Sequence, residues 1–211
     1  MRFLITAGPT REPLDPVRFL SNRSSGRMGY ALAEAALAAG HEVTLVSGPV
    51  ALAAPAGAEL VRVETAREMF EAVRGAIPRC DAAVFCAAVA DYRPVAAAGQ
   101  KLKKNGERLV LELEPTEDIL GSARTVFGFR GYLVGFAAET EKLVEHAQAK
   151  LARKGCDLLV ANDVSQPGIG FDSDENEVIL CLPGGQTRVL PRQSKTALAR
   201  ELVSFIAAAA S

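Results

Sequence analysis

The chain has 211 residues, 49% of them hydrophobic and 23% charged, and its formal net charge at pH 7 is −1. This length suits one domain, residues 1–211, with a sizeable core. The near-neutral charge argues against nucleic acid or a membrane surface as a partner held by bulk electrostatics. The first apolar run, broken by Gly8 and Pro9, is too short for a signal peptide, and FIAAAA at 205–210 is too short to span a bilayer. We therefore expect a cytoplasmic protein.

Six short apolar runs predict β-strands, at residues 2–7, 42–48, 59–63, 82–90, 132–137 and 157–162. Stretches with apolar residues at helical spacing lie between several of them, at residues 27–40, 65–76 and 139–155. Apolar strands that alternate with amphipathic helices are typical of a parallel sheet covered on both faces. The predicted fold class is α/β, a doubly wound, Rossmann-like and mostly parallel sheet.

Local signals mark several helix ends. Thr65 with Glu68 three residues later has the pattern of a capping box. Gly40 and Gly155 stand where helix-ending glycines belong, and Ser194 is the predicted N-cap of a last helix that runs through KTALARELVSFIA.

Two segments alternate with period two and predict hairpins. One is residues 100–114, around Asn105-Gly106, and the other is residues 177–191, which turn at Gly184-Gly185. The first, at about 99–114, is expected to project from the sheet as an arm, and its exposed edges need a pairing partner.

The cysteines and histidines of the sequence indicate whether disulfides or a metal site are to be expected. Cys80, Cys86, Cys156 and Cys181 show no C-x-x-C spacing and three of them lie in apolar runs, which predicts buried free thiols in a reducing compartment. The two histidines do not favour a histidine-built metal site.

The connection from Ala7 to Arg27 is unusually long. It has roughly twenty residues against the usual two to six of an α/β unit, and in open α/β sheets ligands bind at the carboxyl end of the first strand. Ser24-Ser25-Gly26 stand just before the helix. They admit two interpretations, a serine N-cap without a ligand or a phosphate held on the first amides of the helix. The G-x-G-x-x-G and G-x-x-x-x-G-K-[ST] patterns are absent.

Six blocks, in order and spacing, resemble the phosphopantothenoylcysteine synthetases of coenzyme A biosynthesis. They are GPTREPLDPVRFLSNRSSGRMGYALAEAA, VTLVSGPVAL, AAVADYRP, KLKK, VGFAAET and ANDVSQPGIGF, and the likeness runs from residue 3 to about 205. In many bacteria this unit follows a flavin-dependent decarboxylase in one chain. A chain that opens at MRFLITAGPT looks like a free-standing synthetase or a separately expressed domain, with a separate decarboxylase as a possible partner.

The resemblance implies a ligation in two steps. The carboxylate of 4′-phosphopantothenate attacks the α-phosphate of CTP to give an acyl-cytidylate and pyrophosphate, and the amine of L-cysteine then displaces CMP. Joining two anions requires positive charge and Mg²⁺. The bacterial-style blocks favour CTP over ATP.

The resemblance also implies roles for individual residues. Lys101 matches the lysine that forms the cytidylate, although composition alone favours a solvated lysine. Asn22 matches the asparagine that turns the intermediate into product; its amide can donate to substrate oxygens, and the alternative is an Asx turn. Arg18 matches an arginine that pairs with the 4′-phosphate, and the alternative is a surface arginine.

Further matched residues would line the nucleotide site or the substrate site. Ala87 would let the backbone approach the substrate, Asp91 would reach Mg²⁺ or a ribose hydroxyl, and Phe136 would lie beside the base. Lys150 and Lys154 share one helix face, which usually means a solvated face, and in the family such lysines reach the nucleotide phosphates. Residues 161–171 would form a further loop on the same rim.

The chain also departs from the family pattern. Residues 115–119 read Pro-Thr-Glu-Asp-Ile where Lys-Asn-Pro-Asp-Ile is common, so Asp118 and Ile119 match, while the Lys and Asn of a segment that borders the cytosine pocket in relatives are replaced. Arg27 replaces a usual lysine and Gln100 a usual glutamate.

The resemblance further implies a homodimer formed through the hairpin arm, in which Lys101 serves the neighbouring protomer. Two rival functions stay open. One is a nicotinamide- or flavin-dependent oxidoreductase, suggested by the wound fold alone, and the other is a catalytically silent nucleotide-binding module.

Overall fold

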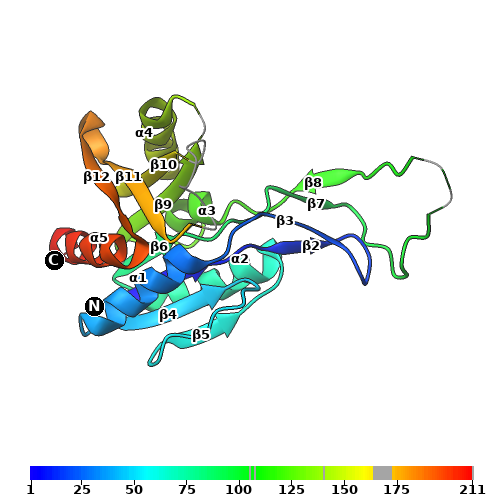
Figure 1. The fold of residues 1–211 in the computed structure, drawn as a ribbon, viewed down its shortest axis with the longest axis horizontal. Coiled ribbons are helices and arrows are strands. Elements are labelled where there is room, and N and C mark those ends of the chain that lie inside the picture. Colours follow the sequence, from blue (N-terminus) through cyan, green and yellow to red (C-terminus); the bar gives the residue numbers. More distant parts are fainter. Residues whose placement is uncertain (105, 107, 140, 164–172, 211) are drawn as a thin grey trace.

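The computed structural model describes residues 1–104, 106, 108–139, 141–163 and 173–210. An eight-stranded sheet forms its centre, in the order β12-β11-β10-β9-β6-β1-β4-β5 (Figure 1). Its strands are β1 (Arg2–Ala7), β4 (Glu42–Ser47), β5 (Glu59–Arg62), β6 (Ala82–Phe85), β9 (Tyr132–Glu139), β10 (Leu158–Asp163), β11 (Glu175–Cys181) and β12 (Thr187–Ser194). The helices are α1 (Arg27–Ala38), α2 (Ala66–Ala76), α3 (Ile119–Thr125), α4 (Leu143–Lys154) and α5 (Lys195–Ala209), with two 3₁₀ turns, η1 (Ile77–Arg79) and η2 (Pro183–Gly185).

In the order β5-β4-β1-β6-β9-β10, six neighbouring strands of this sheet pair in parallel, and β11 pairs antiparallel with both β10 and β12. The chain moves from β1 outward to β4 and β5, then returns to place β6 on the other side of β1. The strand order therefore reverses between β1 and β6, and the carboxyl ends of these two strands are where an open α/β sheet forms its ligand crevice. The predicted doubly wound α/β fold is confirmed.

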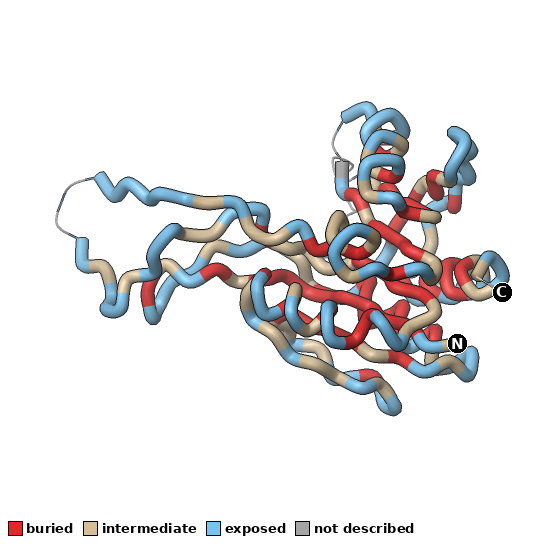
Figure 2. Tube along the Cα trace, turned by 180° about the vertical axis from the view of Figure 1, so that it is seen from behind, coloured by how far each residue is buried: buried red, intermediate tan, exposed pale blue. Residues whose placement is uncertain are grey.

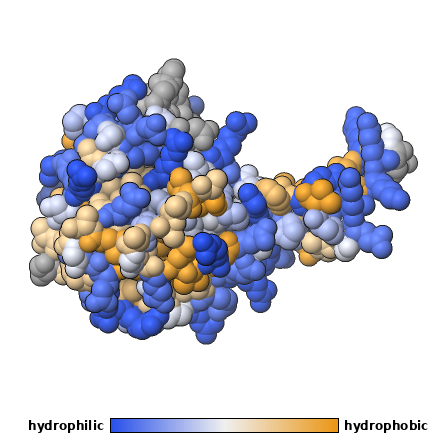
Figure 3. All heavy atoms as spheres, turned by 60° about the horizontal axis from the view of Figure 1, so that its bottom comes forward, coloured by the Kyte–Doolittle hydropathy of each residue, from blue (hydrophilic) through white to orange (hydrophobic). Residues whose placement is uncertain are grey.

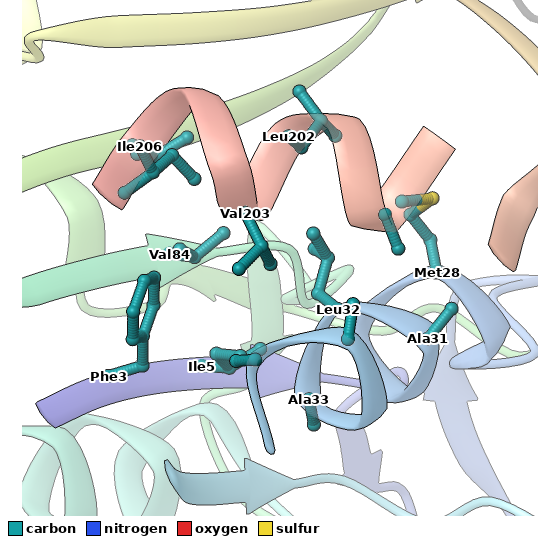
Figure 4. Packing of buried hydrophobic residues seen from close by; sticks show 14 of the residues in the cluster. Phe3, Ile5, Met28, Ala31, Leu32, Ala33, Val84, Leu202, Val203 and Ile206 are labelled. Atoms are coloured by element: carbon teal, nitrogen blue, oxygen red, sulfur yellow. The ribbon is translucent and has the colours of Figure 1, made fainter. Parts of the chain in front are cut away.

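Both faces of the sheet are covered. Phe3 and Ile5 of β1 point into a core shared with α1 and α5, and Figure 4 shows Leu32 of α1 and Val203 of α5 on that side. Leu4, the alternate residue, belongs to the opposite core with α2, α3 and α4. This alternation follows from the period of two in a strand. It explains why the central strands are apolar throughout, since both of their faces are buried (Figure 2).

Most of the predicted local signals are confirmed. Thr65 and Glu68 form the complete capping box of α2, and Ser194 caps α5 by accepting a hydrogen bond from Ala197 N at 3.2 Å. Gly155 ends α4 in the left-handed conformation. The four cysteines are free, and Cys156 and Cys181 are buried while Cys80 and Cys86 are half-buried. Within the described residues, no helix is both long and apolar enough to cross a bilayer.

Two pairs of short strands project from the sheet beside each other, and we call residues 11–21 and 92–115 the extension (Figure 1). β2 (Arg11–Pro13) pairs with β3 (Phe19–Ser21), and β7 (Tyr92–Pro94) pairs with β8 (Leu113–Pro115). The predicted hairpin over 100–114 is wrong in its pairing, because the ladder joins Tyr92–Pro94 to Leu113–Pro115 and its first strand lies before residue 100. Its turn residues Asn105 and Glu107 lie outside the described residues. A two-stranded ribbon is marginal by itself, which accounts for the short ladder.

An ion pair ties the two halves of the extension together. Asp15, only 4% exposed, accepts hydrogen bonds from Arg18 Nε (3.0 Å) and Arg18 Nη2 (2.5 Å) and from the backbone N of Leu102 (3.1 Å). Arg18 Nη2 also donates to the carbonyl oxygen of Leu102 at 2.7 Å. The bonds from Arg18, helped by backbone amides, outweigh burial and hold the pKa of Asp15 well below its usual range.

Replacing Asp15 with asparagine will lower the protection of the Leu102 amide against hydrogen exchange. The pKa of Asp15 is lower in the folded protein than in the unfolded chain. The ionised carboxylate therefore gives its full stabilisation of the fold above the ordinary aspartate pKa of about 3.9. This stabilisation disappears as the pH falls through the pKa of Asp15 in the folded protein. The difference in protection factor between wild type and D15N will therefore be largest at neutral pH and will narrow below about pH 4. A difference that stays constant down to pH 2 would show that the charge of Asp15 is not the cause.

Candidate functional site

A cleft of about 660 Å³ opens at the carboxyl edge of the sheet, where β1, β6 and β9 end. Most of the residues predicted from the sequence line it, namely Asn22, Ser24, Ser25, Gly26, Ala87, Asp91, Asp118, Ile119, Phe136, Lys150 and Lys154. Two do not. Arg18 and Lys101 lie on the extension, outside the lining of the cleft in their own chain. The strand order places the cleft where an open α/β sheet binds ligands.

The first turn of α1 faces the cleft without a serine cap. The N-cap is Gly26, with φ 77°, and the hydroxyl of Ser24 accepts a hydrogen bond from Gly26 N at 3.3 Å. The serine N-cap interpretation is therefore wrong, because neither serine occupies the capping position. Since glycine has no side chain, no N-cap group covers the amides of Met28 and Gly29, which line the cleft. Open amides at the positive end of a helix favour an anion.

Glycines let α1 approach the end of β1 closely. A Cβ on Gly26 would lie 3.3 Å from the Cα of Gly8, and a Cβ on Gly29 would lie 2.5 Å from the Cβ of Ala7. Tight turning and close helix–strand packing are two of the tasks of the glycines in a dinucleotide-binding fingerprint. A search for the linear pattern misses this arrangement, because residues 9–25 separate the first glycine from the other two.

Replacing Gly29 with alanine will lower the free energy of unfolding by about 1–3 kcal/mol, because the new methyl group overlaps Ala7 and pushes α1 off the sheet. Gly75 is the matched control. It lies in α2 with no atom within 4 Å of an added Cβ, so G75A will leave stability unchanged or raise it by about 0.5–1 kcal/mol. Urea unfolding followed by circular dichroism measures both variants. Equal stability of G29A and wild type would contradict the close packing.

Asn22 joins the connection after β1 to the connection after β6. Its Nδ2 donates to the carbonyl oxygens of Ala88 (3.0 Å) and Val89 (3.1 Å), and Ala88 N donates to the carbonyl oxygen of Gly8 at 2.9 Å. The sequence led us to expect the Asn22 amide to donate to substrate oxygens. In the structure both hydrogens of Nδ2 are used by the backbone, so Oδ1 is the atom left for a ligand.

The opposite wall of the cleft is cationic. Lys150 and Lys154 lie one turn apart on α4, where Lys150 Nζ donates to the carbonyl oxygen of Phe136 (3.0 Å) and Lys154 Nζ forms an ion pair with Asp118. Burial raises the pKa of Asp118, but the bonds from Lys154 and the Gly121 amide outweigh it, and the pKa lies below the ordinary value. The sequence suggested lysines on a solvated face or lysines that reach a ligand, and the structure places both on the wall of the cleft.

Residues 115–119, whose sequence departs from the family pattern, are held in place by hydrogen bonds of Thr116 and Glu117. Thr116 donates through its backbone N to the carbonyl oxygen of Asp91 (3.0 Å) and through Oγ1 to that of Ala90 (2.6 Å). Both oxygens of Glu117 accept from Arg93 Nη1 at 3.0 Å, which neutralises the charge of Glu117. Residues 116–119 thus still line the cleft.

One carboxylate at the rim suits a magnesium ion. Asp91 is exposed, lines the cleft, and makes no side-chain hydrogen bond or ion pair within the described part of the chain. In that same part, no three His, Cys, Asp or Glu side chains form a group that would hold a metal by themselves. Mg²⁺ is usually bound by one or two carboxylates together with substrate phosphates. A single aspartate in the same cleft as the first turn of α1 agrees with this mode of coordination.

Sequence reasoning missed several residues of the cleft. Thr6, Cys86, Arg153, Asn176 and Lys195 also line it. Asn162 lines the cleft as well, but it was not missed, because it belongs to the predicted rim segment 161–171, most of which lies outside the described residues. Lys195 carried a readable signal, because a lysine at the first position of a helix opposes the helix dipole.

Comparison with known proteins places these features in a family. The model of the DNA/pantothenate metabolism flavoprotein C-terminal domain matches residues 1–209. The coenzyme A biosynthesis bifunctional protein CoaBC of Vibrio vulnificus is 47% identical over 96% of this chain and 51% of its own length, and that of Escherichia coli is 46% identical over 98% of this chain and 51% of its own. The chain therefore spans about half the length of these curated relatives.

A solved structure agrees with the sequence comparison. The crystal structure of the C-terminal domain of a coenzyme A biosynthesis bifunctional protein CoaBC superposes with a TM-score of 0.83 at 43% identity, covering 97% of this chain and 93% of that one. The resemblance to the phosphopantothenoylcysteine synthetases is confirmed at the level of the family. By its fold, its glycine-built cleft and these matches, the chain belongs to the family of the DNA/pantothenate metabolism flavoprotein C-terminal domain.

Proposed function

We propose that this protein is a phosphopantothenate–cysteine ligase, a cytoplasmic enzyme of coenzyme A biosynthesis that uses CTP. It joins 4′-phosphopantothenate and L-cysteine through an acyl-cytidylate and releases pyrophosphate and CMP. One observation carries the proposal, namely that the open amides of α1 and the cationic wall of α4 line a single cleft. Such a cleft suits a reaction in which every substrate but cysteine carries several negative charges.

In the first step, a carboxylate oxygen of phosphopantothenate bonds to the α-phosphorus of CTP, and the bond from that phosphorus to the pyrophosphate breaks. The amides of residues 27–29 hold phosphate oxygens, and Lys150 and Lys154 neutralise charge from the other wall. The cytosine lies against Phe136 and the backbone of 116–119. When bound, Mg²⁺ supplies charge neutralisation at the phosphates, and Asp91 would hold it.

In the second step, the cysteine amine attacks the acyl carbon, CMP leaves, and the nitrogen loses a proton. Asn22 Oδ1 accepts an N–H of the incoming amine, which orients the nitrogen towards the acyl carbon. The two hydrogen bonds from its Nδ2 to Ala88 and Val89 fix the direction of Oδ1. Ala87, just after β6, has a side chain small enough for the protein backbone to approach the substrate.

Arg18 and Lys101 act on the cleft of a second protomer in a homodimer formed by the extension. Leu102, next to Lys101, is held by Asp15 and Arg18, so these bonds would have to break for Lys101 to reach the cleft of its own chain. The extension also exposes apolar side chains, which are Val17, Phe19, Tyr92, Val95, Leu109, Val110, Leu111 and Leu113 (Figure 3). Exposed apolar side chains gathered on one part of a molecule are typical of a protein interface.

Incubation of the protein with phosphopantothenate, Mg²⁺ and either CTP or ATP, with and without cysteine, tests the proposal. Pyrophosphate in the absence of cysteine and amide product in its presence are expected, with CTP preferred over ATP. No pyrophosphate with either nucleotide would defeat the ligase assignment.

The wound fold alone suggested an oxidoreductase, and copurification of a flavin or nicotinamide would support that alternative. A separately expressed decarboxylase is a possible partner, and size exclusion of a mixture tests it.

A further inference from the structure

Residues 116–118 line the cleft, and a different part of the molecule holds each of them. Thr116 is hydrogen-bonded to the connection after β6, and Asp118 forms an ion pair with a lysine of α4. Glu117, between them, is bonded to Arg93 of β7, in the extension (Figure 1). The contact of Glu117 therefore joins this part of the cleft to the extension.

Arg93 binds two carboxylates with separate groups of its guanidinium. Its Nε donates to Glu114 Oε1 at 2.8 Å, and its Nη1 donates to both carboxylate oxygens of Glu117 at 3.0 Å. Glu114 is the residue opposite Arg93 in the β7–β8 ladder, so its bond fixes the guanidinium on the extension. The side chains of Arg93 and Glu117 are 24% and 25% exposed, so water screens their charges less than those of an ordinary surface ion pair.

Glu117 is ionised in this environment. Burial raises the pKa of its carboxyl group, but the bonds from Arg93, helped by a backbone amide, outweigh burial and hold the pKa below its ordinary value. Without Arg93, a partly buried carboxylate would stand unpaired, which is unfavourable, and Glu117 would turn towards water. Because Thr116 and Glu117 are adjacent, the backbone that lines the cleft would move with the side chain.

From these contacts we infer that Arg93 is a positioning residue for the nucleotide base, because through Glu117 it holds the backbone of residues 116–118 in the place where cytosine binds. The inference rests on the proposed function and adds to it a residue that does not line the cleft. Groups that bind a ligand keep their geometry to within about 0.5 Å only when neighbouring hydrogen bonds support them. Arg93 supplies that support from the extension of the same chain.

Calorimetric titration of three probes tests the inference, namely CTP, CMP and inorganic tripolyphosphate, each with Mg²⁺. The variant R93M/E117Q removes the ion pair and leaves the net charge of this part of the cleft unchanged. It will weaken CTP and CMP, which carry the same base, about 5–30-fold, and it will leave tripolyphosphate within about twofold of wild type. A general disturbance of the fold would weaken tripolyphosphate as well.

Two further variants control for the removal of an ion pair. R74M/E71Q is the matched control, because Arg74 and Glu71 form an exposed pair on α2, with 3.5 Å between Arg74 Nη1 and Glu71 Oε2. It will bind all three probes as wild type does. R93K keeps the charge but lacks the planar fork of donors, so it will lose less affinity for CTP than R93M/E117Q.

Hydrogen exchange measures the position of residues 116–118 without a ligand. The Thr116 amide, which donates to the carbonyl oxygen of Asp91, will exchange about 10-fold faster in R93M/E117Q. The Ser122 amide, which donates to the carbonyl oxygen of Asp118, will exchange as in wild type. Unchanged exchange at Thr116, unchanged CTP binding, or equal weakening of all three probes would overturn the inference.

The outcome for wild type separates this inference from the proposed function. A wild-type protein that binds CTP and CMP but forms no amide would refute the ligase and leave the Arg93 comparison intact. A wild-type protein that binds CTP no more tightly than tripolyphosphate but forms amide would overturn the inference and leave the ligase standing. A wild-type protein that binds neither CTP nor tripolyphosphate would overturn both.

Discussion

Replacing Asn22 with aspartate will leave pyrophosphate release close to wild type and will lower amide formation about 10²–10³-fold. The nitrogen that donates to Ala88 and Val89 becomes an oxygen, so two hydrogen bonds are replaced by repulsion between a carboxylate and two carbonyl oxygens. The connection after β6 shifts, and a negative charge stands beside an anionic intermediate. Both effects act where we propose that the cysteine amine attacks, whereas the phosphates are proposed to bind at the start of α1.

Separate assays of the two products make this result specific. Pyrophosphate is measured with phosphopantothenate and CTP alone, and the amide after addition of cysteine. S21A is the control, because Ser21 neighbours Asn22 but donates to the carbonyl oxygen of Thr10, away from the reacting groups. Loss of both products in N22D, with S21A active, would show that Asn22 supports the first step or the fold instead of the second step.

Replacing Lys101 with glutamine will lower pyrophosphate release about 10²–10³-fold. In the proposed first step the lysine charge is needed while two anions approach each other, and glutamine keeps the length and polarity of the side chain without the charge. K103Q is the matched control, because Lys103 is an exposed lysine on the same part of the extension. Wild-type pyrophosphate release by K101Q would contradict the role of Lys101.

Purified heterodimers of N22D and K101Q subunits, isolated with two different affinity tags, test whether Lys101 acts across the dimer. If it does, one of the two clefts combines Asn22 and Lys101 from different chains, and about half of the wild-type amide formation returns. A mixture of the two unexchanged homodimers controls for diffusion of the acyl-cytidylate. A heterodimer no more active than that mixture would show that Lys101 serves its own chain and not the neighbouring one.

Short-range sequence signals predicted the strands of the sheet and the helix caps, because these features depend on residues that are close together in the sequence. The apolar run of β1, the capping box at Thr65 and Glu68, and Ser194 before α5 each depend on residues a few positions apart. β2 and β3, of three residues each, and α3, of seven, are too short to show a period. The hairpin over 100–114 was wrong because its alternating pattern has no buried face within one chain.

The residues of the site that come directly after the ends of strands could be predicted from the sequence. Ala87, Asp91 and the turn before α1 come directly from the wound topology, and Lys150 and Lys154 came from the family resemblance. Asn176 and Lys195 were missed because they reach the cleft only through the antiparallel pair β11 and β12, whose place beside β10 no local pattern indicates.

A crystal structure with a non-hydrolysable CTP analogue, Mg²⁺ and phosphopantothenate tests the central claim most directly. We predict phosphate density against the backbone amides of residues 27–29, with the base beside Phe136. Well-ordered nucleotide density elsewhere, with the start of α1 vacant, would contradict the account.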